Sequence, residues 1–185
     1  MKNISIFGGS ITQPGEKDYQ QAVLLGQLLS QNSYTIMTGG YIGVMEAVSR
    51  GAAEIGGRVI GYTCDEIENW RSIQPNSWVQ EERRQKTIRQ RLFALIEDCD
   101  AALALPGGPG TLNEIAMMWT LVLTGVISPR PLILIGSGWK STFQDFYKNF
   151  DTYIPLEQRE LLSFAPDIIS SISMLCQIDE QNKSG

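Results

Sequence analysis

The residues with the clearest chemical potential lie in the run ALPGGPGTLNEIA, residues 104–116. Three glycines, Gly107, Gly108 and Gly110, separate an apolar strand-like segment from a helix-like segment. Glycines at such a junction let backbone N–H groups approach an anion, and a helix start adds free N–H groups and a positive partial charge. The run therefore predicts a phosphate-binding turn, with the carboxylate of Glu114 close by for acid–base work.

The pair Thr111 and Glu114 also fits a purely structural role. T-x-x-E at a helix start is the spacing of a capping box. Thr111 would then be the N-cap and accept a bond from the Glu114 amide, while the Glu114 side chain would bond back. This alternative explains Thr111 and Glu114, but it does not explain three glycines together.

Arg91 is the second candidate, within the charged stretch 81–100, which predicts one helix. The apolar stripe of that helix is expected to consist of Ile88, Leu92, Leu95 and Ile96. The spacing places Arg91 on or beside this stripe, with Arg84 and Thr87 on the same side. An arginine on an inward edge needs an anionic partner, because an unpaired buried charge is costly. The alternative is that Arg91 belongs to a solvated basic face.

The elements that must position these residues alternate along the chain. Expected strands are 3–9, 34–40, 58–63, 101–108 and 131–138, and expected helices are 18–31, 43–57, 81–100, 111–125, 140–150 and 165–178. Residues 64–79 read as irregular. The alternation predicts a single Rossmann-like α/β domain over residues 1–178, doubly wound, with a mainly parallel sheet and helices on both faces. Residues 179–185 read as a polar C-terminal tail.

Glycine turns follow four of the expected strands. They contain Gly8 and Gly9, Gly39 and Gly40, Gly107 and Gly108, and Gly136 and Gly138. In a parallel sheet these turns share the edge where ligands bind. Neither common phosphate fingerprint is present: the chain lacks GxxxxGK[ST], and GGSITQPG is not GxGxxG.

Composition excludes several classes of function. The chain has no histidine, so histidine-based triads, bases and metal ligands are excluded. Its three cysteines form no CxxC pair and predict neither a disulfide framework nor a zinc site. A net charge of −5 argues against nucleic-acid binding. The apolar run near the N-terminus is too short for a signal peptide or a membrane span, which favours a cytoplasmic protein without membrane contact.

Three sequence motifs together resemble one known family. PGGPGTLNE (106–114) matches a PGGxGTxxE pattern, TGGYIGVMEAVSRGAAEIGGRVIG (38–61) is similar to the family's second glycine loop and following helix, and FGGS (7–10) to its first loop. The chain thus resembles the Lonely Guy family of cytokinin-riboside 5′-monophosphate phosphoribohydrolases, part of a group formerly described as lysine decarboxylase-like. The likeness covers about residues 3–175.

The resemblance implies a Rossmann-like homodimer or larger homo-oligomer with no organic cofactor and no metal. It implies cleavage of the N-glycosidic bond of a nucleoside 5′-monophosphate, AMP-like or cytokinin-riboside monophosphate, to free base and ribose 5-phosphate. Glu114 and Arg91 take the family's catalytic positions. The implied phosphate- and nucleotide-binding residues are Gly8, Gly9, Ser10, Gly39, Gly40, Gly43, Met45, Gly107, Gly108, Gly110 and Thr111.

Several positions depart from the family pattern. Leu92 stands where a lysine usually follows the arginine, and Thr38 and Glu46 stand where the second loop usually has glycine. The segment 64–80 also differs from the plant-type enzymes. These departures favour an alternative function, a non-catalytic protein that binds a nucleotide or a phosphorylated cofactor. The related molybdenum-cofactor carrier proteins share the expected architecture.

Overall fold

The apolar segments of the chain form one sheet because each is a short run of residues that can be buried on both faces. The computed structural model describes residues 2–184. All strand pairs are parallel, in the order β4-β3-β2-β1-β5-β6-β7. The strands are β1 (Asn3–Phe7), β2 (Thr35–Thr38), β3 (Val59–Cys64), β4 (Glu81–Gln85), β5 (Ala101–Ala104), β6 (Leu132–Ile135) and β7 (Ser163–Ala165).

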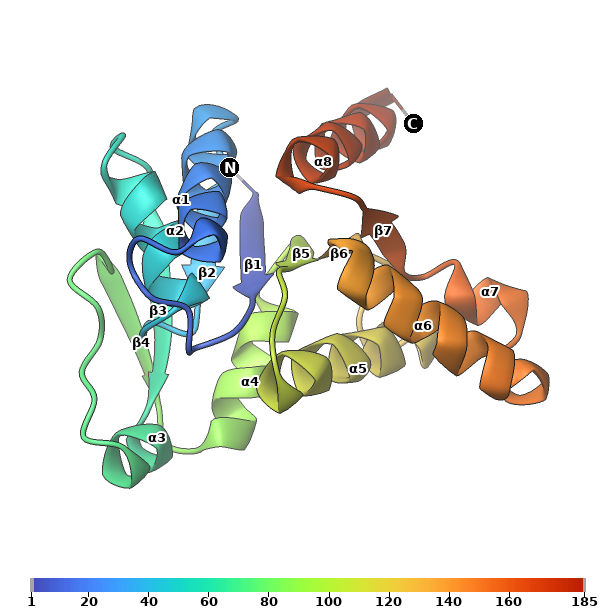
Figure 1. Ribbon diagram of the computed structural model, residues 1–185, viewed down its shortest axis with the longest axis horizontal. Helices are drawn as coiled ribbons and strands as arrows, with labels where there is room; N and C mark the ends of the chain where they lie inside the picture. The colour runs from blue at the N-terminus through green and yellow to red at the C-terminus, as the bar shows by residue number, and fades with distance from the viewer. Residues whose placement is uncertain (1, 185) are drawn as a thin grey trace.

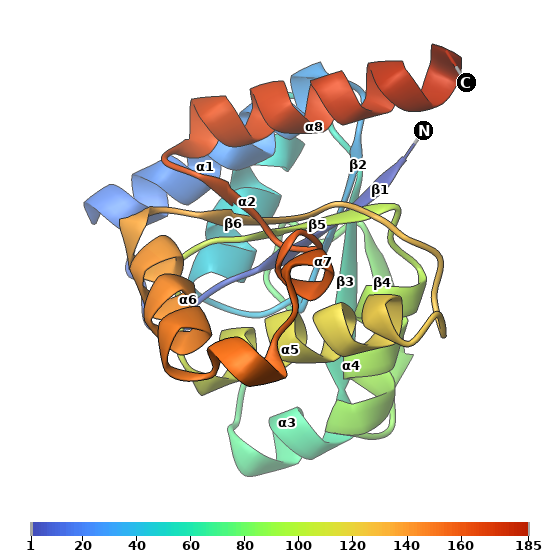
Figure 2. The ribbon, with the colours of Figure 1, turned by 90° about the vertical axis from the view of Figure 1, so that its right-hand side faces the viewer.

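Helices cover both faces of this sheet (Figures 1 and 2). One face packs against α1 (Lys17–Gln31), α2 (Val44–Ala53) and α8 (Ile168–Ser184). The other packs against α4 (Ile88–Glu97), α5 (Pro109–Leu123) and α6 (Ser137–Asn149). The short elements are α3 (Asp65–Trp70), the 3-10 turn Asp151–Tyr153 and α7 (Leu156–Arg159). The predicted Rossmann-like, doubly wound fold is therefore confirmed.

The prediction of one helix over residues 81–100 is wrong in its first third. Residues Glu81–Gln85 form β4, which pairs with β3 from Ile60↔Glu81 to Cys64↔Gln85. Their charged side chains favour a helix locally, but backbone pairing at the open edge of the sheet prevails. Arg84 therefore does not share a helix face with Arg91. The charges on β4 also protect this edge strand from pairing with another chain.

Two further regions are more regular than the sequence indicates. The stretch 64–79 contains α3, and the stretch between α6 and α8 contains α7 and β7, which were not expected. The last helix runs through Ser184 and so includes residues 179–184 of the expected tail. Within it, Asp179 accepts hydrogen bonds from Lys2 Nζ at 2.6 Å and from Tyr34 Oη at 2.8 Å.

The glycine turns meet where the strand order reverses, between β1 and β5. The register Phe7↔Ala104 sets the turn after β1 beside the turn after β5. The Gly9 amide donates to the Pro106 carbonyl at 3.1 Å and ties the two turns together. Within residues 2–184 no helix is both long and apolar enough to cross a membrane.

Candidate active site

A cavity of about 580 Å³ lies at the carboxyl ends of the central strands. Both predicted catalytic residues, Arg91 and Glu114, line it. So do seven of the predicted binding residues: Gly8, Gly9, Ser10, Met45, Gly108, Gly110 and Thr111. Its volume is in the range of sites that enclose small ligands.

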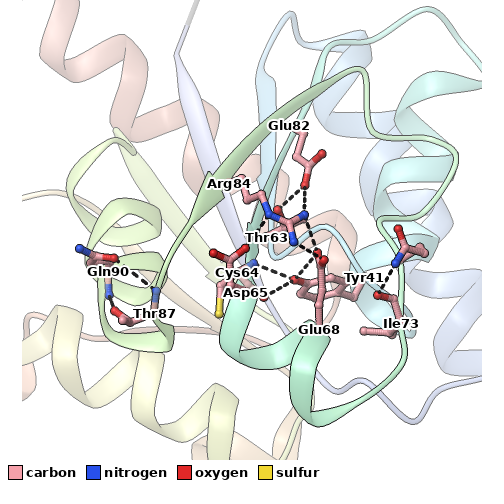
Figure 3. Close-up of polar contacts among 11 residues, drawn as sticks. Tyr41, Thr63, Cys64, Asp65, Glu68, Ile73, Glu82, Arg84, Thr87 and Gln90 are labelled. Atoms are coloured by element: carbon pink, nitrogen blue, oxygen red, sulfur yellow. Dashed lines mark hydrogen bonds and ion pairs between the residues drawn. The ribbon is translucent and has the colours of Figure 1, made fainter.

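The start of α5 forms one wall of this cavity and is not a capping box. The helix begins at Pro109 with Gly108 as its N-cap, and no side chain caps it. Thr111 is the third residue of the helix rather than its N-cap, so the structural alternative for Thr111 and Glu114 is wrong. A full capping box does occur at the start of α4, where it joins Thr87 and Gln90 (Figure 3).

The start of α5 leaves several donors without a partner. Among the described residues, none accepts a hydrogen bond from the backbone amides of Gly108, Gly110 or Thr111. The Thr111 side chain is buried, at 3% exposure, yet its hydroxyl also has no hydrogen-bond partner in the described chain. Such free donors at a helix start form an anion-binding site.

Arg91 projects from α4 into the floor of the cavity and is only 8% exposed. Its Nε donates to the Tyr62 carbonyl at 2.6 Å, and its Nη2 lies 3.6 Å from Met45 Sδ. The guanidinium also lies 5.6 Å from the centre of the Tyr41 ring. Burial lowers the pKa of Arg91, while the charge of Glu114 raises it. The prediction that Arg91 lies on the inward side of its helix is confirmed.

Glu114 lies in the second turn of α5, partly buried, with its carboxyl group facing the cavity. Burial raises the pKa of this carboxyl group to about 7, although the charge of Arg91 acts to lower it. Within residues 2–184 its carboxylate accepts no hydrogen bond and forms no ion pair within 4 Å. Its electrostatic partner is Arg91. A carboxyl group that titrates near neutral pH beside a cavity is suited to acid–base work.

Four predicted binding residues do not line the cavity, but their lack of a side chain makes room for the residues that do. They are Gly39, Gly40, Gly43 and Gly107. A Cβ on Gly39 would lie 1.5 Å from Arg91 Nη2, so only glycine leaves room for the guanidinium. A Cβ on Gly107 would lie 2.1 Å from Thr111 Oγ1. The backbones at Gly40 and Gly43 have φ angles of 79° and 73°, which favour glycine.

Residues on two sides of the cavity were not predicted from the sequence as site residues. Tyr41, from the turn after β2, lines it and is nearly buried. Its hydroxyl accepts from the Cys64 amide at 2.7 Å and lies 3.2 Å from Glu68 Oε1. The outer wall comes from Ile67, Trp70, Arg71 and Ile73. The two tryptophans in the expected irregular stretch were the available signal for this wall.

The departures from the family pattern at Glu46 and Leu92 do not reach the cavity. Glu46 accepts a hydrogen bond from Tyr19 Oη at 3.2 Å, on the side of α2 that packs against α1. Leu92 is buried in the hydrophobic cluster beneath the sheet. Neither residue lines the cavity. Among the described residues, no three His, Cys, Asp or Glu side chains are grouped so that they could hold a metal ion.

Comparison with sequence families and characterised proteins places these residues in context. Residues 1–145 match the model of the SLOG cluster4 family. A cytokinin riboside 5′-monophosphate phosphoribohydrolase of Arabidopsis thaliana is 30% identical over 173 residues, covering 89% of this chain and 77% of the relative.

Solved structures share the whole architecture. The molybdenum cofactor binding protein of Rippkaea orientalis superposes with a TM-score of 0.74 at 23% identity, covering 96% of each chain. The molybdenum cofactor carrier protein of Chlamydomonas reinhardtii gives 0.71 at 22% identity, covering 95% of this chain and 96% of the other. At these identities the likeness describes the fold.

Proposed function

Because this chain belongs to the SLOG cluster4 family and is a distant homologue of the Lonely Guy phosphoribohydrolases, we propose that it hydrolyses the N-glycosidic bond of a nucleoside 5′-monophosphate. The substrate is an AMP-like nucleotide or a cytokinin-riboside monophosphate. The products are the free base and ribose 5-phosphate. The observation that carries this proposal is the pairing of Glu114 and Arg91 in one cavity with the free donors of α5.

In this proposal the start of α5 binds the phosphate. The free amides of Gly108, Gly110 and Thr111 and the Thr111 hydroxyl supply donors, and the helix adds a positive partial charge. The phosphate lies away from the bond that breaks, so its binding positions the sugar. Fixing a substrate in this way can provide much of the reduction in the barrier.

Glu114 then acts at the anomeric carbon. As the bond to the base breaks, positive charge develops on the ribosyl group, and a nearby carboxylate stabilises it. The base leaves with the bonding electrons and takes up a proton from solvent, to which Glu114 later returns the proton that it accepts from water. The ionised Glu114 orients the water whose oxygen bonds to the anomeric carbon and accepts a proton from it. Arg91 favours the ionised form of Glu114.

Chromatography of the products tests this reaction directly. Incubation with AMP is expected to release adenine and ribose 5-phosphate, and Glu114→Gln is expected to abolish the release. Glu97→Gln is the matched control, because Glu97 is exposed at the end of α4 and does not line the cavity. Equal release by the wild type and Glu114→Gln would refute the mechanism.

A non-catalytic binding protein is the second candidate. Supporting it is the likeness to molybdenum cofactor binding and carrier proteins. A thermal-shift screen separates the two functions, because a ligand that binds only the folded state raises its stability. Stabilisation by AMP with no release of adenine would favour the second candidate.

We also propose that the chain forms a homodimer or larger homo-oligomer, as the family resemblance implies. Large apolar side chains on and just after α5 support this: Leu112 is 44% exposed, Leu123 is 43% exposed and Val126 is 66% exposed. A contiguous apolar patch marks a surface that binds other proteins, and these residues are the ones on and just after α5 that we propose contribute to it. Sedimentation equilibrium of the full chain measures the mass, and a monomer at micromolar concentration would contradict the proposal.

A further inference from the structure

The outer wall of the cavity has no role in the chemistry proposed above. Four residues on or next to α3 form it: Ile67, Trp70, Arg71 and Ile73. Trp70 is 71% exposed, although tryptophan is among the side chains that gain most from burial. A large aromatic side chain left exposed at the mouth of a cavity indicates a surface that a ligand covers.

Trp70 and Arg71 form a stacked pair at this wall. The Arg71 guanidinium lies 4.2 Å from the centre of the Trp70 ring, within the range of a cation–π contact. In the described part of the chain, neither side chain makes a hydrogen bond or an ion pair. The indole is therefore held on one face and remains available on the other.

The segment that carries the pair is anchored on both sides. Before it, Arg84 Nε donates to Asp65 at 2.6 Å and Glu68 lies 3.2 Å from the Tyr41 hydroxyl (Figure 3). After it, Asn76 Nδ2 donates to the carbonyls of Gly40 at 3.0 Å and Tyr41 at 2.8 Å. These bonds fix the backbone around the pair, so the ring is presented to the cavity in a defined position.

We propose that Trp70, braced by Arg71, is the stacking platform for the base of the bound nucleotide and favours purines over pyrimidines. The lining of the cavity contains the groups that such a ligand needs: the start of α5, the Glu114–Arg91 pair and the outer wall with its two isoleucines and Trp70. A bicyclic indole overlaps a bicyclic purine more fully than a single-ring pyrimidine. The identity of the ligand rests on the proposed function, but base stacking is independent of catalysis.

The rival role for this wall is anion binding, since Arg71 is a cation without an ionic partner among the described residues. Ligands with and without a base separate the two roles. AMP carries base, ribose and phosphate, whereas ribose 5-phosphate lacks the base. A stacking residue affects the first ligand much more than the second.

Calorimetric titration in a Glu114→Gln background measures binding without turnover. Trp70→Ala is expected to weaken AMP binding by about tenfold, which is within the range for loss of one base–aromatic stack. Binding of ribose 5-phosphate should change less than about twofold, and the preference for AMP over UMP should fall with the loss of the stack. Trp70→Phe should keep most of the affinity for AMP, because it keeps an aromatic face.

Trp78→Ala is the matched control. Trp78 lies in the same segment but contacts Arg50, 5.9 Å from its ring, and does not line the cavity. The Trp78→Ala substitution should leave the affinity for AMP unchanged. Equal losses for AMP and ribose 5-phosphate on Trp70→Ala, or no loss for either, would overturn the stacking role.

The hydrolase proposal is judged separately, by adenine release from the wild type. If no adenine is released but Trp70→Ala weakens AMP binding selectively, the stacking role of Trp70 is supported and the hydrolase proposal is refuted. If adenine is released and Trp70→Ala changes the affinity for neither AMP nor ribose 5-phosphate, the hydrolase proposal is supported and the stacking role is refuted.

Discussion

Arg91 and Glu114 influence each other across the cavity through charge, without a direct hydrogen bond or close ion pair in the described structure. Burial of the Glu114 carboxyl group raises its pKa to about 7, and the positive charge of Arg91 opposes this rise. Burial in turn lowers the pKa of Arg91, and Glu114 opposes that shift. Each group therefore makes the charged form of the other less costly in a site shielded from water.

This relationship predicts the pH dependence of the proposed reaction. The ionised form of Glu114 is the active form, so kcat/KM for AMP should rise with pH through an inflection near 7 in the wild type. Arg91→Gln removes the charge that lowers the pKa of Glu114, so the inflection should move to higher pH. Initial rates at saturating and limiting AMP from pH 5 to pH 9 measure both effects. An inflection that stays in place or moves down in Arg91→Gln would contradict the coupling.

The same carboxyl group should reduce stability at high pH. Its pKa is about 7 in the folded chain against 4.5 for an unperturbed glutamate, so the folded state holds the proton more tightly than the unfolded state. The stability that this proton provides is present below about pH 4.5 and is lost as the pH rises to about 7. Glu114→Gln should therefore raise the free energy of unfolding at pH 8 by on the order of 3 kcal/mol and change it little at pH 4.5.

Urea unfolding at the two pH values measures this difference. Glu97→Gln, at an exposed position, serves as the control and should give the same small change at both. If Glu114→Gln were less stable than the wild type at pH 8, the ionised carboxylate would stabilise the folded state, which would contradict this prediction.

Gly39 is expected to be essential for the position of Arg91. A Cβ at this residue would lie 1.5 Å from Arg91 Nη2 and 2.6 Å from Met45 Sδ. Both are ends of flexible side chains, so Gly39→Ala should displace the guanidinium rather than prevent folding. We expect kcat/KM to fall by roughly 100-fold, since small misplacements in an active site can cost that much. The free energy of unfolding should fall by about 1–3 kcal/mol.

Gly138→Ala provides the comparison for Gly39→Ala, because a Cβ there would meet nothing within 4 Å. It should retain full activity. If Gly39→Ala also retained full activity, the guanidinium of Arg91 would have no strict positional role.

The parts of this structure that follow from local pattern could be predicted from the sequence. The glycine turns, Arg91 and Glu114 meet because parallel strands bring their carboxyl ends to one edge, and the alternation of elements predicts that edge. The charged segment Glu81–Gln85 could not be predicted as a strand, because its pairing with β3 is a tertiary contact. The wall at Trp70 and Arg71 was missed for the same reason, since anchors distant in sequence such as Arg84 hold it.

The two threonine motifs show why spacing alone is ambiguous. T-x-x-E at Thr111 looks like a capping box but is not one, whereas Thr87 forms a true capping box with Gln90 at the start of α4. Thr87→Ala should lower the free energy of unfolding by about 1 kcal/mol, because α4 loses its cap, and should leave the affinity for AMP unchanged.

Thr111→Val should have the opposite effects: little change in the free energy of unfolding and weaker binding of AMP. The Thr111 hydroxyl has no hydrogen-bond partner within residues 2–184, so its replacement by a methyl group should change the free energy of unfolding by less than about 1 kcal/mol. If that hydroxyl donates to the phosphate, the affinity for AMP should fall by roughly tenfold or more, as expected for a hydrogen bond to a charged group. Urea unfolding and calorimetric titration of both variants measure the two quantities. If Thr111→Val lost stability but kept its affinity for AMP, Thr111 would have a structural role and its hydroxyl would not bind the phosphate.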